Sequence, residues 1–133
     1  LRGEDGDRPQ PTLADLPGLI TDNRAAGLRI EFSGLALEGL SPAVSRHAYR
    51  IVQEGLTNAR KHAPGAKVEV WLSGDPDSGL RIELRNPVNR RGAAVPGGGY
   101  GLLGLAERTS LVDGWTEHGI RDDVFQLEAW MPW

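Results

Sequence analysis

The chain has 133 residues and a formal net charge of −3, and it contains no cysteine. This length fits one domain that can bury its own core, and the lack of cysteine excludes disulfides and thiolate metal sites. The acidic balance argues against a nucleic-acid partner, and no apolar run approaches the roughly 20 residues of a membrane span. We therefore expect a cytoplasmic domain with no direct membrane contact, whether or not its parent protein is anchored.

The pattern along the chain predicts a linker followed by helices and strands. Residues 1–11 are charged, contain Gly and Pro, and lack apolar periodicity, which is typical of a linker. Thr12 followed by Asp15 is a helix N-cap pattern, and Ser41 with Pro42 begins the longest helix. The predicted elements are, in chain order, a helix over 12–27, a strand over 28–34, a helix over 41–63, strands over 68–72 and 80–84, a loop over 87–101, a helix over 102–112, and strands over 115–118 and 124–131.

This order of elements favours the α+β class. Strands joined by short turns form hairpins, so most of the predicted sheet is antiparallel. Amphipathic helices must cover one apolar face of such a sheet, which gives a two-layer sandwich. We expect residues 12–133 to form this one domain.

The helix over 41–63 carries polar residues beside its apolar stripe. Glu54, Asn58 and His62 are spaced by four, so they follow the edge of that stripe, where burial without a partner is costly. A metal ion with a polyphosphate would be such a partner: an amide oxygen suits Mg²⁺, Lys61 or His62 can meet phosphate oxygens, and Glu54 can orient a nucleophile. The alternative is that these residues only border a solvated face. The apolar stripe consists of Val44, Ala48, Ile51, Gly55 and Ala59.

Residues 50–63, RIVQEGLTNARKHA, resemble the N-box of bacterial sensor histidine kinases. Their form is typical of the subfamily whose partner regulators resemble the nitrate-response regulators. The resemblance implies the Bergerat ATP-binding fold, a mixed sheet with helices on one face. It also implies that Asn58 holds Mg²⁺, that Glu54 is the acidic catalytic residue, and that Lys61 and His62 approach phosphates. ATP and Mg²⁺ are then the expected cofactors.

Residues 97–108, GGGYGLLGLAER, place glycines just before and inside a helix start. Glycine permits close backbone approach, and the free N–H groups of a first helical turn attract phosphate. Alone this signal is weak, because glycine-rich surface loops without a ligand are common. The stretch resembles the G2 box of the same family, about forty residues after the N-box, which implies that residues 88–100 are the ATP lid. The residues expected to contact nucleotide here are Gly99, Gly101, Leu102 and Gly104.

The chain departs from the family where the base would be recognised. The family usually has an Asp followed by glycines after the second hairpin strand, and this carboxylate accepts a hydrogen bond from the adenine amino group. Here Asn86 and Pro87 occupy that place, and Val124 replaces the Thr that commonly opens the last strand. Asn86 remains the expected base contact, and loss of ATP binding is the open alternative.

None of the three histidines fits the phosphorylated histidine of the family, which is followed by an acidic residue. His47, His62 and His118 are each followed by Ala or Gly. We expect His47 to be a packed or surface helix residue and His118 to lie in a hairpin loop. The resemblance therefore implies that the acceptor histidine lies on a separate dimerisation domain of a homodimeric parent, whose further partner is a response regulator.

The implied function is binding of Mg²⁺·ATP and transfer of its γ-phosphate to that histidine, so this chain alone would not autophosphorylate. Two rivals remain. One is an anti-sigma-factor-like serine kinase of the same fold, which transfer to a serine would support. The other is a degenerate, non-catalytic protein-interaction module, which failure to bind any adenine nucleotide would support.

Overall fold

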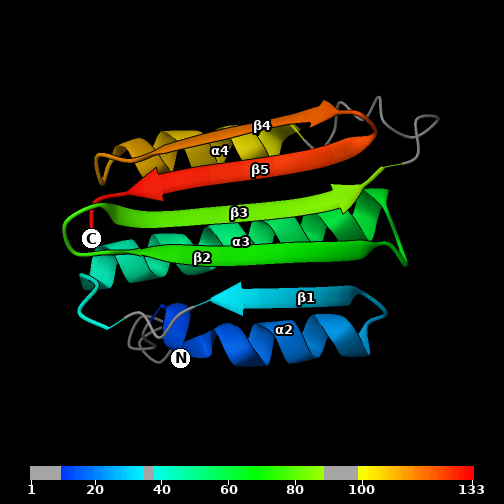
Figure 1. Cartoon of the computed structure of the whole chain (residues 1–133), viewed down its shortest axis with the longest axis horizontal. Helices are drawn as coiled ribbons and strands as arrows, with labels where there is room; N and C mark the ends of the chain where they lie inside the picture. Colours follow the sequence, from blue (N-terminus) through cyan, green and yellow to red (C-terminus); the bar gives the residue numbers. More distant parts are fainter. Residues whose placement is uncertain (1–9, 35–37, 89–98) are drawn as a thin grey trace, which may run out of the picture.

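The fold is described from a computed structural model for residues 10–34, 38–88 and 99–133, without the side chains of residues 99–101. The strands lie side by side in one layer, and the helices form a second layer (Figure 1). The elements are, in chain order, the 3-10 helix η1 (Leu13–Asp15), α2 (Leu16–Ala25), β1 (Arg29–Gly34), α3 (Pro42–His62), β2 (Lys67–Asp75), β3 (Gly79–Pro87), α4 (Gly99–Ser110), β4 (Trp115–Arg121) and β5 (Val124–Met131).

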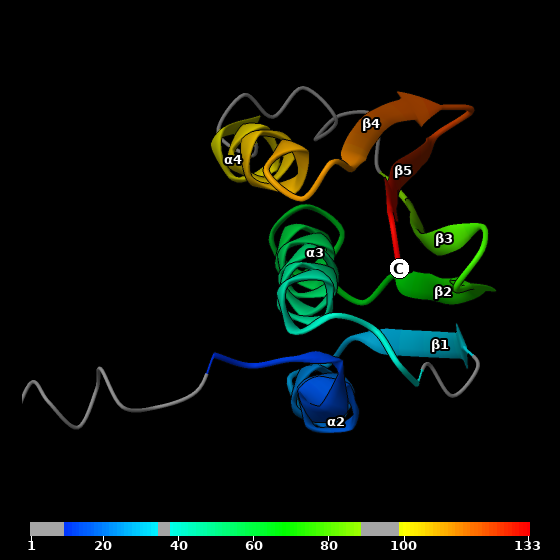
Figure 2. The same cartoon turned by 90° about the vertical axis from the view of Figure 1, so that its left-hand side faces the viewer.

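One five-stranded sheet forms the first layer. Its strand order is β1-β2-β3-β5-β4; β1 pairs with β2 in parallel and the other three pairs are antiparallel. The helices α2, α3 and α4 form the second layer and all lie on the same face of this sheet (Figure 2). The predicted fold class, a mostly antiparallel mixed sheet covered on one face, is confirmed.

The core lies between the two layers. Alternation puts every second residue of β2, β3 and β5 against the helices, and α3 lies over the middle of the sheet. At Gly55 a Cβ atom would stand 2.6 Å from Leu84 Cδ2, so a larger residue there would force the Leu84 side chain to move. The predicted stripe of α3 is buried throughout. The buried side chains facing it from these strands include Val68, Val70, Leu72, Leu80, Ile82, Leu84, Leu127, Ala129 and Met131.

The predicted helix starts are confirmed at both caps. The Ala14 N–H donates to Thr12 Oγ1 at 3.2 Å, and the Thr12 N–H donates to Asp15 Oδ2 at 2.9 Å, which completes a capping box. The first turn is a 3-10 helix, and α2 ends at Ala25 rather than at Gly27, whose φ is +107°. Ser41 accepts from the Val44 N–H at 3.3 Å and begins α3.

Several predicted boundaries differ from the structure. The expected loop over 87–101 is shorter, because Pro87 still pairs with Val124 and α4 begins at Gly99 instead of residue 102. Glycine lowers helix propensity by only about 1 kcal/mol per residue, which core burial of the same helix outweighs. β4 extends to Arg121, so His118 lies opposite Leu127 within a strand and not in the hairpin loop.

In the part of the chain that the structure describes, no helix combines the length and apolarity that crossing a membrane requires. The longest described helix, α3, is polar along its outer face and carries its apolar residues toward the sheet.

Candidate functional site

Three elements bring the predicted site residues to one end of the molecule. The C-terminal ends of α3 and β3 and the N-terminal end of α4 all lie at the right-hand end in Figure 1. Gly55 of α3 lies against Leu84 of β3. Both elements run toward that end. Asn58, which follows Gly55 in α3, and Asn86, which follows Leu84 in β3, therefore both lie on the side of this contact that is nearer to that end.

Asn58 is a buried amide with no protein partner among the described residues. Its exposed fraction is 6 %, and its side chain makes no hydrogen bond to the described chain. The other buried polar side chains behave differently, since Asn23 donates to Leu19 O at 2.9 Å and Thr109 donates to Leu105 O at 2.6 Å. Buried polar groups are normally hydrogen-bonded, so Asn58 is a place where an external ligand would be accommodated.

His62 repeats this feature one turn further along α3. Its Nε2 atom is buried and lacks a hydrogen-bond partner in the described structure. Glu54, one turn before Asn58, is half-buried, and Lys61 is exposed near the end of the helix. The predicted row of a carboxylate, an amide and an imidazole therefore lies at the boundary between the core and the outer surface.

Asn86 is also buried, at 4 % exposure, on the face of β3 that meets the helices. Its Nδ2 donates to the carbonyl oxygen of Pro87 at 3.1 Å. This bond uses the amide nitrogen and leaves Oδ1 as an acceptor without a partner in the described chain. Val124, the other departure from the family pattern, pairs with Pro87 immediately beside it.

The glycines at the start of α4 divide into two groups. Gly99 and Gly101 lie in the first turn of the helix, and their surroundings are outside the described side chains. A Cβ atom added at Gly104 would meet nothing within 4 Å, so packing does not require glycine there. Leu102 is buried in the core at 4 % exposure, which leaves its backbone, not its side chain, for the contact expected from the sequence. Of the expected lid over 88–100, residues 89–98 lie outside the description.

A resident metal cluster is not present in the described residues. No group of three or more His, Asp and Glu side chains lies close enough to hold an ion. Mg²⁺ commonly keeps several waters and is bound by one or two protein oxygens together with substrate phosphates. The amide oxygen of Asn58 is therefore compatible with an ion that takes its other ligands from waters and phosphates.

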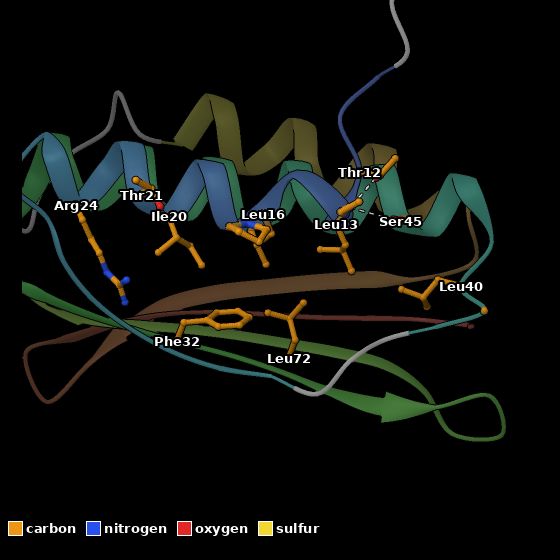
Figure 3. A pocket seen from close by; sticks show the side chains of 13 residues that line it. Thr12, Leu13, Leu16, Ile20, Thr21, Arg24, Phe32, Leu40, Ser45 and Leu72 are labelled. Atoms are coloured by element: carbon orange, nitrogen blue, oxygen red, sulfur yellow. Dashed lines mark hydrogen bonds between the residues drawn. The ribbon is translucent and has the colours of Figure 1, made fainter.

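The structure also has a groove that the sequence did not predict. A groove of about 660 Å³ lies between the first helices and the edge of the sheet, where Leu16 and Ile20 face Phe32 and Leu72 (Figure 3). The Leu13 N–H donates to Ser45 Oγ at 3.0 Å at one end of it. Alternation along β1 predicts that Phe32 is buried, but it is 39 % exposed, so the sequence carried no signal for this groove. None of the predicted nucleotide residues lines this groove.

Comparison with solved structures gives the fold. The blue-light-activated histidine kinase EL346 of Erythrobacter litoralis superimposes with a TM-score of 0.72 over 92 % of this chain and 42 % of its own, at 14 % identity. The catalytic domain of the histidine kinase ThkA, in a nucleotide-free form, gives 0.62 over 89 % of this chain and 94 % of its own, at 13 % identity. This chain has the fold of a histidine kinase catalytic domain.

Sequence comparison gives sensor histidine kinases as homologues. The sensor histidine kinase YxjM of Bacillus subtilis is 33 % identical over 124 residues, and LiaS of the same organism is 37 % identical over 79 residues. These alignments cover 90 % and 59 % of this chain but only 30 % and 22 % of the two relatives, so the chain spans less than a third of either. No protein-family model matches the chain.

Proposed function

We propose that this domain binds Mg²⁺·ATP and presents its γ-phosphate to a histidine on another domain of its parent protein. The observation that carries the proposal is the unpartnered row of Asn58 and His62 Nε2, buried at the end where α3, β3 and α4 meet. A nucleotide with its metal ion would supply both missing partners at once. The histidine kinase fold and homologues support this choice among ligands.

At the phosphate end, the roles follow from the type and exposure of each side chain. Asn58 would offer its amide oxygen to Mg²⁺, which when bound neutralises charge on the phosphates. His62 would donate to a phosphate oxygen, and the exposed Lys61 would add a mobile positive charge. The N–H groups around Gly99, Gly101 and Leu102, in the first turn of α4, would bind phosphate oxygens along the helix axis.

Glu54 would act on the acceptor and not on the nucleotide base. It is half-buried one turn before Asn58, and no described residue forms an ion pair with it. A carboxylate in that position can accept the proton of an incoming imidazole and hold the ring for attack on the γ-phosphate. Most of the catalysis is then positioning and charge stabilisation by this chain.

At the base end, Asn86 would read adenine through Oδ1. Because Nδ2 is held by the Pro87 carbonyl oxygen, the amide presents an acceptor, and the amino group of adenine is a donor. The carbonyl oxygen of guanine would meet that acceptor unfavourably. We therefore propose that adenine specificity survives the replacement of the family's Asp.

The remaining partners are proposed from the resemblance and the homologues. The acceptor would belong to a helical dimerisation domain of a homodimeric parent, and a response regulator would take the phosphoryl group from it. The N-box form over residues 50–63 favours the nitrate-sensor-like subfamily. The serine-kinase alternative keeps the same nucleotide site and differs only in the acceptor.

The test uses labelled ATP. We expect the chain alone to form no acid-labile phosphohistidine, and addition of the parent's dimerisation domain to produce it. The Glu54→Gln variant should bind nucleotide normally and transfer at least about tenfold more slowly, in the range of a lost general base. Label on a serine of a partner would support the serine kinase, and label on His47, His62 or His118 of this chain would contradict the proposal.

A further inference from the structure

The strand β4 forms one edge of the sheet. It pairs with β5 along its whole length, from Trp115 to Arg121, and no other described strand lies beside it. Figure 1 shows it as the outermost strand at the top of the sheet. An edge strand presents a row of unpaired backbone N–H and C=O groups, and such a row is a template for pairing with another chain.

The turn between β4 and β5 determines which backbone groups point outward. Asp122 and Asp123 have φ values of 53° and 62°, as in the type I′ turn of a two-residue hairpin. Such a turn joins the backbone of Arg121 to that of Val124, and these two residues lie opposite each other. Because backbone direction alternates along an antiparallel strand, every second residue before Arg121 also faces β5. The residues whose N–H and C=O groups point out of the sheet edge are therefore Thr116, His118 and Ile120.

The edge lacks several devices that protect edge strands. Proline, lysine and β-bulges are such devices, and β4 contains none of them, since its register with β5 runs without a break from Trp115 to Arg121. Ile120 is 48 % exposed although it lies on the helix-facing side of the sheet. Leu103 of α4 is 57 % exposed and lies about 140° round the helix from Arg108, on the side away from α3. Exposed apolar side chains therefore accompany the free backbone groups.

Two exposed charges of β4 have no ion-pair partner in the described structure. Glu117 and Arg121 lie on the face of the sheet away from the helices, and neither forms an ion pair with a described residue. Glu117 stands opposite another carboxylate, Glu128, whose own partner is Arg81. Arg121 stands opposite the uncharged Val124. Like charges directly opposite each other destabilise a sheet, so a cation on the free side of Glu117 would be favourable.

These charges complement each other in a two-fold pair of β4 strands. With the strands antiparallel and Gly119 at the axis, Glu117 of each copy lies opposite Arg121 of the other. The same register puts His118 opposite Ile120, and each such pair can exchange two hydrogen bonds through its outward groups. Moving the axis to His118 or Glu117 would leave Glu117 opposite Gly119 or opposite its own copy. A Cβ atom added at Gly119 meets nothing within 4 Å, so the axis is open in the described structure.

We propose that two copies of this domain associate through their β4 strands, in the register that pairs Glu117 of each copy with Arg121 of the other. Charged side chains on an edge oppose pairing when like charges meet, and in this register opposite charges meet. The two sheets become continuous, and both helical layers lie on the same side. Each α4 covers the sheet beside this edge, so its exposed Leu103 faces the second copy (Figure 2).

A pairing limited to one short strand is weak, and tethering strengthens it. Two domains in one parent protein reach a high effective concentration, so that a weak contact between them becomes populated. The surface is a property of the isolated domain. The inference therefore does not depend on nucleotide binding, and it fails or holds separately from the proposed function.

Sedimentation equilibrium of the full chain tests the pairing. We expect the wild type to approach the mass of a dimer as its concentration rises toward about 1 mM, the range of a weak contact. Glu117→Arg alone and Arg121→Glu alone each bring like charges together, so each should dimerise at least about tenfold more weakly. An equimolar mixture of these two variants restores both opposite pairs and should form a heterodimer at least as tight as the wild-type dimer.

The mixture decides the register, because no general effect of charge makes two weakened chains associate with each other. A mixture that associates no better than either variant would overturn the inference. A wild type that stays monomeric over the whole range would also overturn it. Asp77→Arg is the matched control, because it makes the same charge change in the exposed β2–β3 turn and should leave the association unchanged.

Ile120→Pro tests the backbone contribution. Its N–H points outward, so proline removes a hydrogen bond of the proposed dimer and leaves the pairing with β5, as edge strands tolerate. We expect dimerisation to weaken by at least about tenfold while the far-UV circular dichroism stays that of the wild type. A folded Ile120→Pro chain that dimerises as tightly as the wild type would exclude pairing through β4.

Discussion

Buried polar side chains occur in two regions of this domain, and the two regions differ in whether these side chains have hydrogen-bond partners within the protein. Asn23 of α2 and Thr109 of α4 each bond a carbonyl oxygen of their own helix. Asn58, which is 6 % exposed, and the buried His62 Nε2 lie on the edge of α3 and make no such bond in the described chain. The first pair serves the fold. We interpret the second pair as part of the proposed ligand site.

Asn86 combines both properties, because its Nδ2 is bonded inside the fold and its Oδ1 has no partner in the described chain. Of the variants considered, Asn86→Asp should therefore change the free energy of unfolding most. A carboxylate cannot donate to the Pro87 carbonyl oxygen and is buried at 4 % exposure. We expect the free energy of unfolding to fall by at least about 1 to 3 kcal/mol at neutral pH, measured by urea titration.

The same variant tests whether Asn86 contacts the nucleotide base. A charge-assisted bond is stronger than a neutral one, so bound ATP should gain roughly threefold to thirtyfold in affinity relative to the wild type once the fold is intact. The ratio of ATP to GTP affinity should widen. An unchanged ratio would mean that Asn86 does not read the base, whatever happens to stability.

The variants Asn58→Leu and Thr109→Val compare the unpartnered Asn58 with the hydrogen-bonded Thr109. Each replaces the polar residue by an apolar residue of similar size, and the free energy of unfolding is compared. Thr109→Val loses the bond to Leu105 O and should lower the free energy of unfolding by about 1 kcal/mol. Asn58→Leu loses no bond and should leave it unchanged or higher. Equal losses in chemical denaturation would mean that Asn58 has a partner in the folded chain.

Gly104→Ala tests whether the open space beside Gly104 is used by nucleotide, apart from the effect of the substitution on helix stability. A Cβ atom there meets nothing within 4 Å, and alanine favours a helix by roughly 0.8 to 1 kcal/mol over glycine. The variant should therefore melt at a higher temperature. If the space is used by nucleotide, calorimetric ATP affinity should fall at the same time, whereas unchanged affinity would place Gly104 outside the site.

The smallest effect concerns pH. Burial and the neighbouring Arg50, Arg46 and Arg108 lower the pKa of His47 below its ordinary value of 6.5, so the unfolded chain binds this proton more readily than the folded one. The stability from neutral His47 is fully present above 6.5 and is lost as pH falls through that value toward the folded pKa. In thermal unfolding, His47→Gln should lose less stability than the wild type between about pH 7.5 and pH 5.5. A parallel loss in both chains would contradict this.

Local pattern was sufficient for the elements and for the site helix. The alternation in β2 and β3 and the apolar stripe of α3 at Gly55 are patterns among residues that lie close together in the sequence. Both could therefore be predicted from the sequence. The parallel pairing of β1 with β2 and the membership of His118 in β4 depend on which strand lies alongside. Pairing of that kind is a property of the whole sheet and has no signal within the strand.

The site shows the same division. Spacing by four placed Glu54, Asn58 and His62 on one edge, and the structure keeps them there. The bond from Asn86 Nδ2 to Pro87 O and the burial of Leu102 come from packing around the end of β3 and the start of α4. Neither is encoded in a spacing, and both change what the residue can offer a nucleotide.

The central claim is that Asn58 is unpartnered because a metal-bound nucleotide completes it. Titration calorimetry of ADP, with Mg²⁺ and with EDTA, on the wild type and Asn58→Leu tests this most directly. We expect Mg²⁺ to tighten ADP binding to the wild type by roughly tenfold or more, about 1.4 kcal/mol, and to change binding to Asn58→Leu little. An equal Mg²⁺ effect on both chains, or no ADP binding by the wild type, would contradict the account.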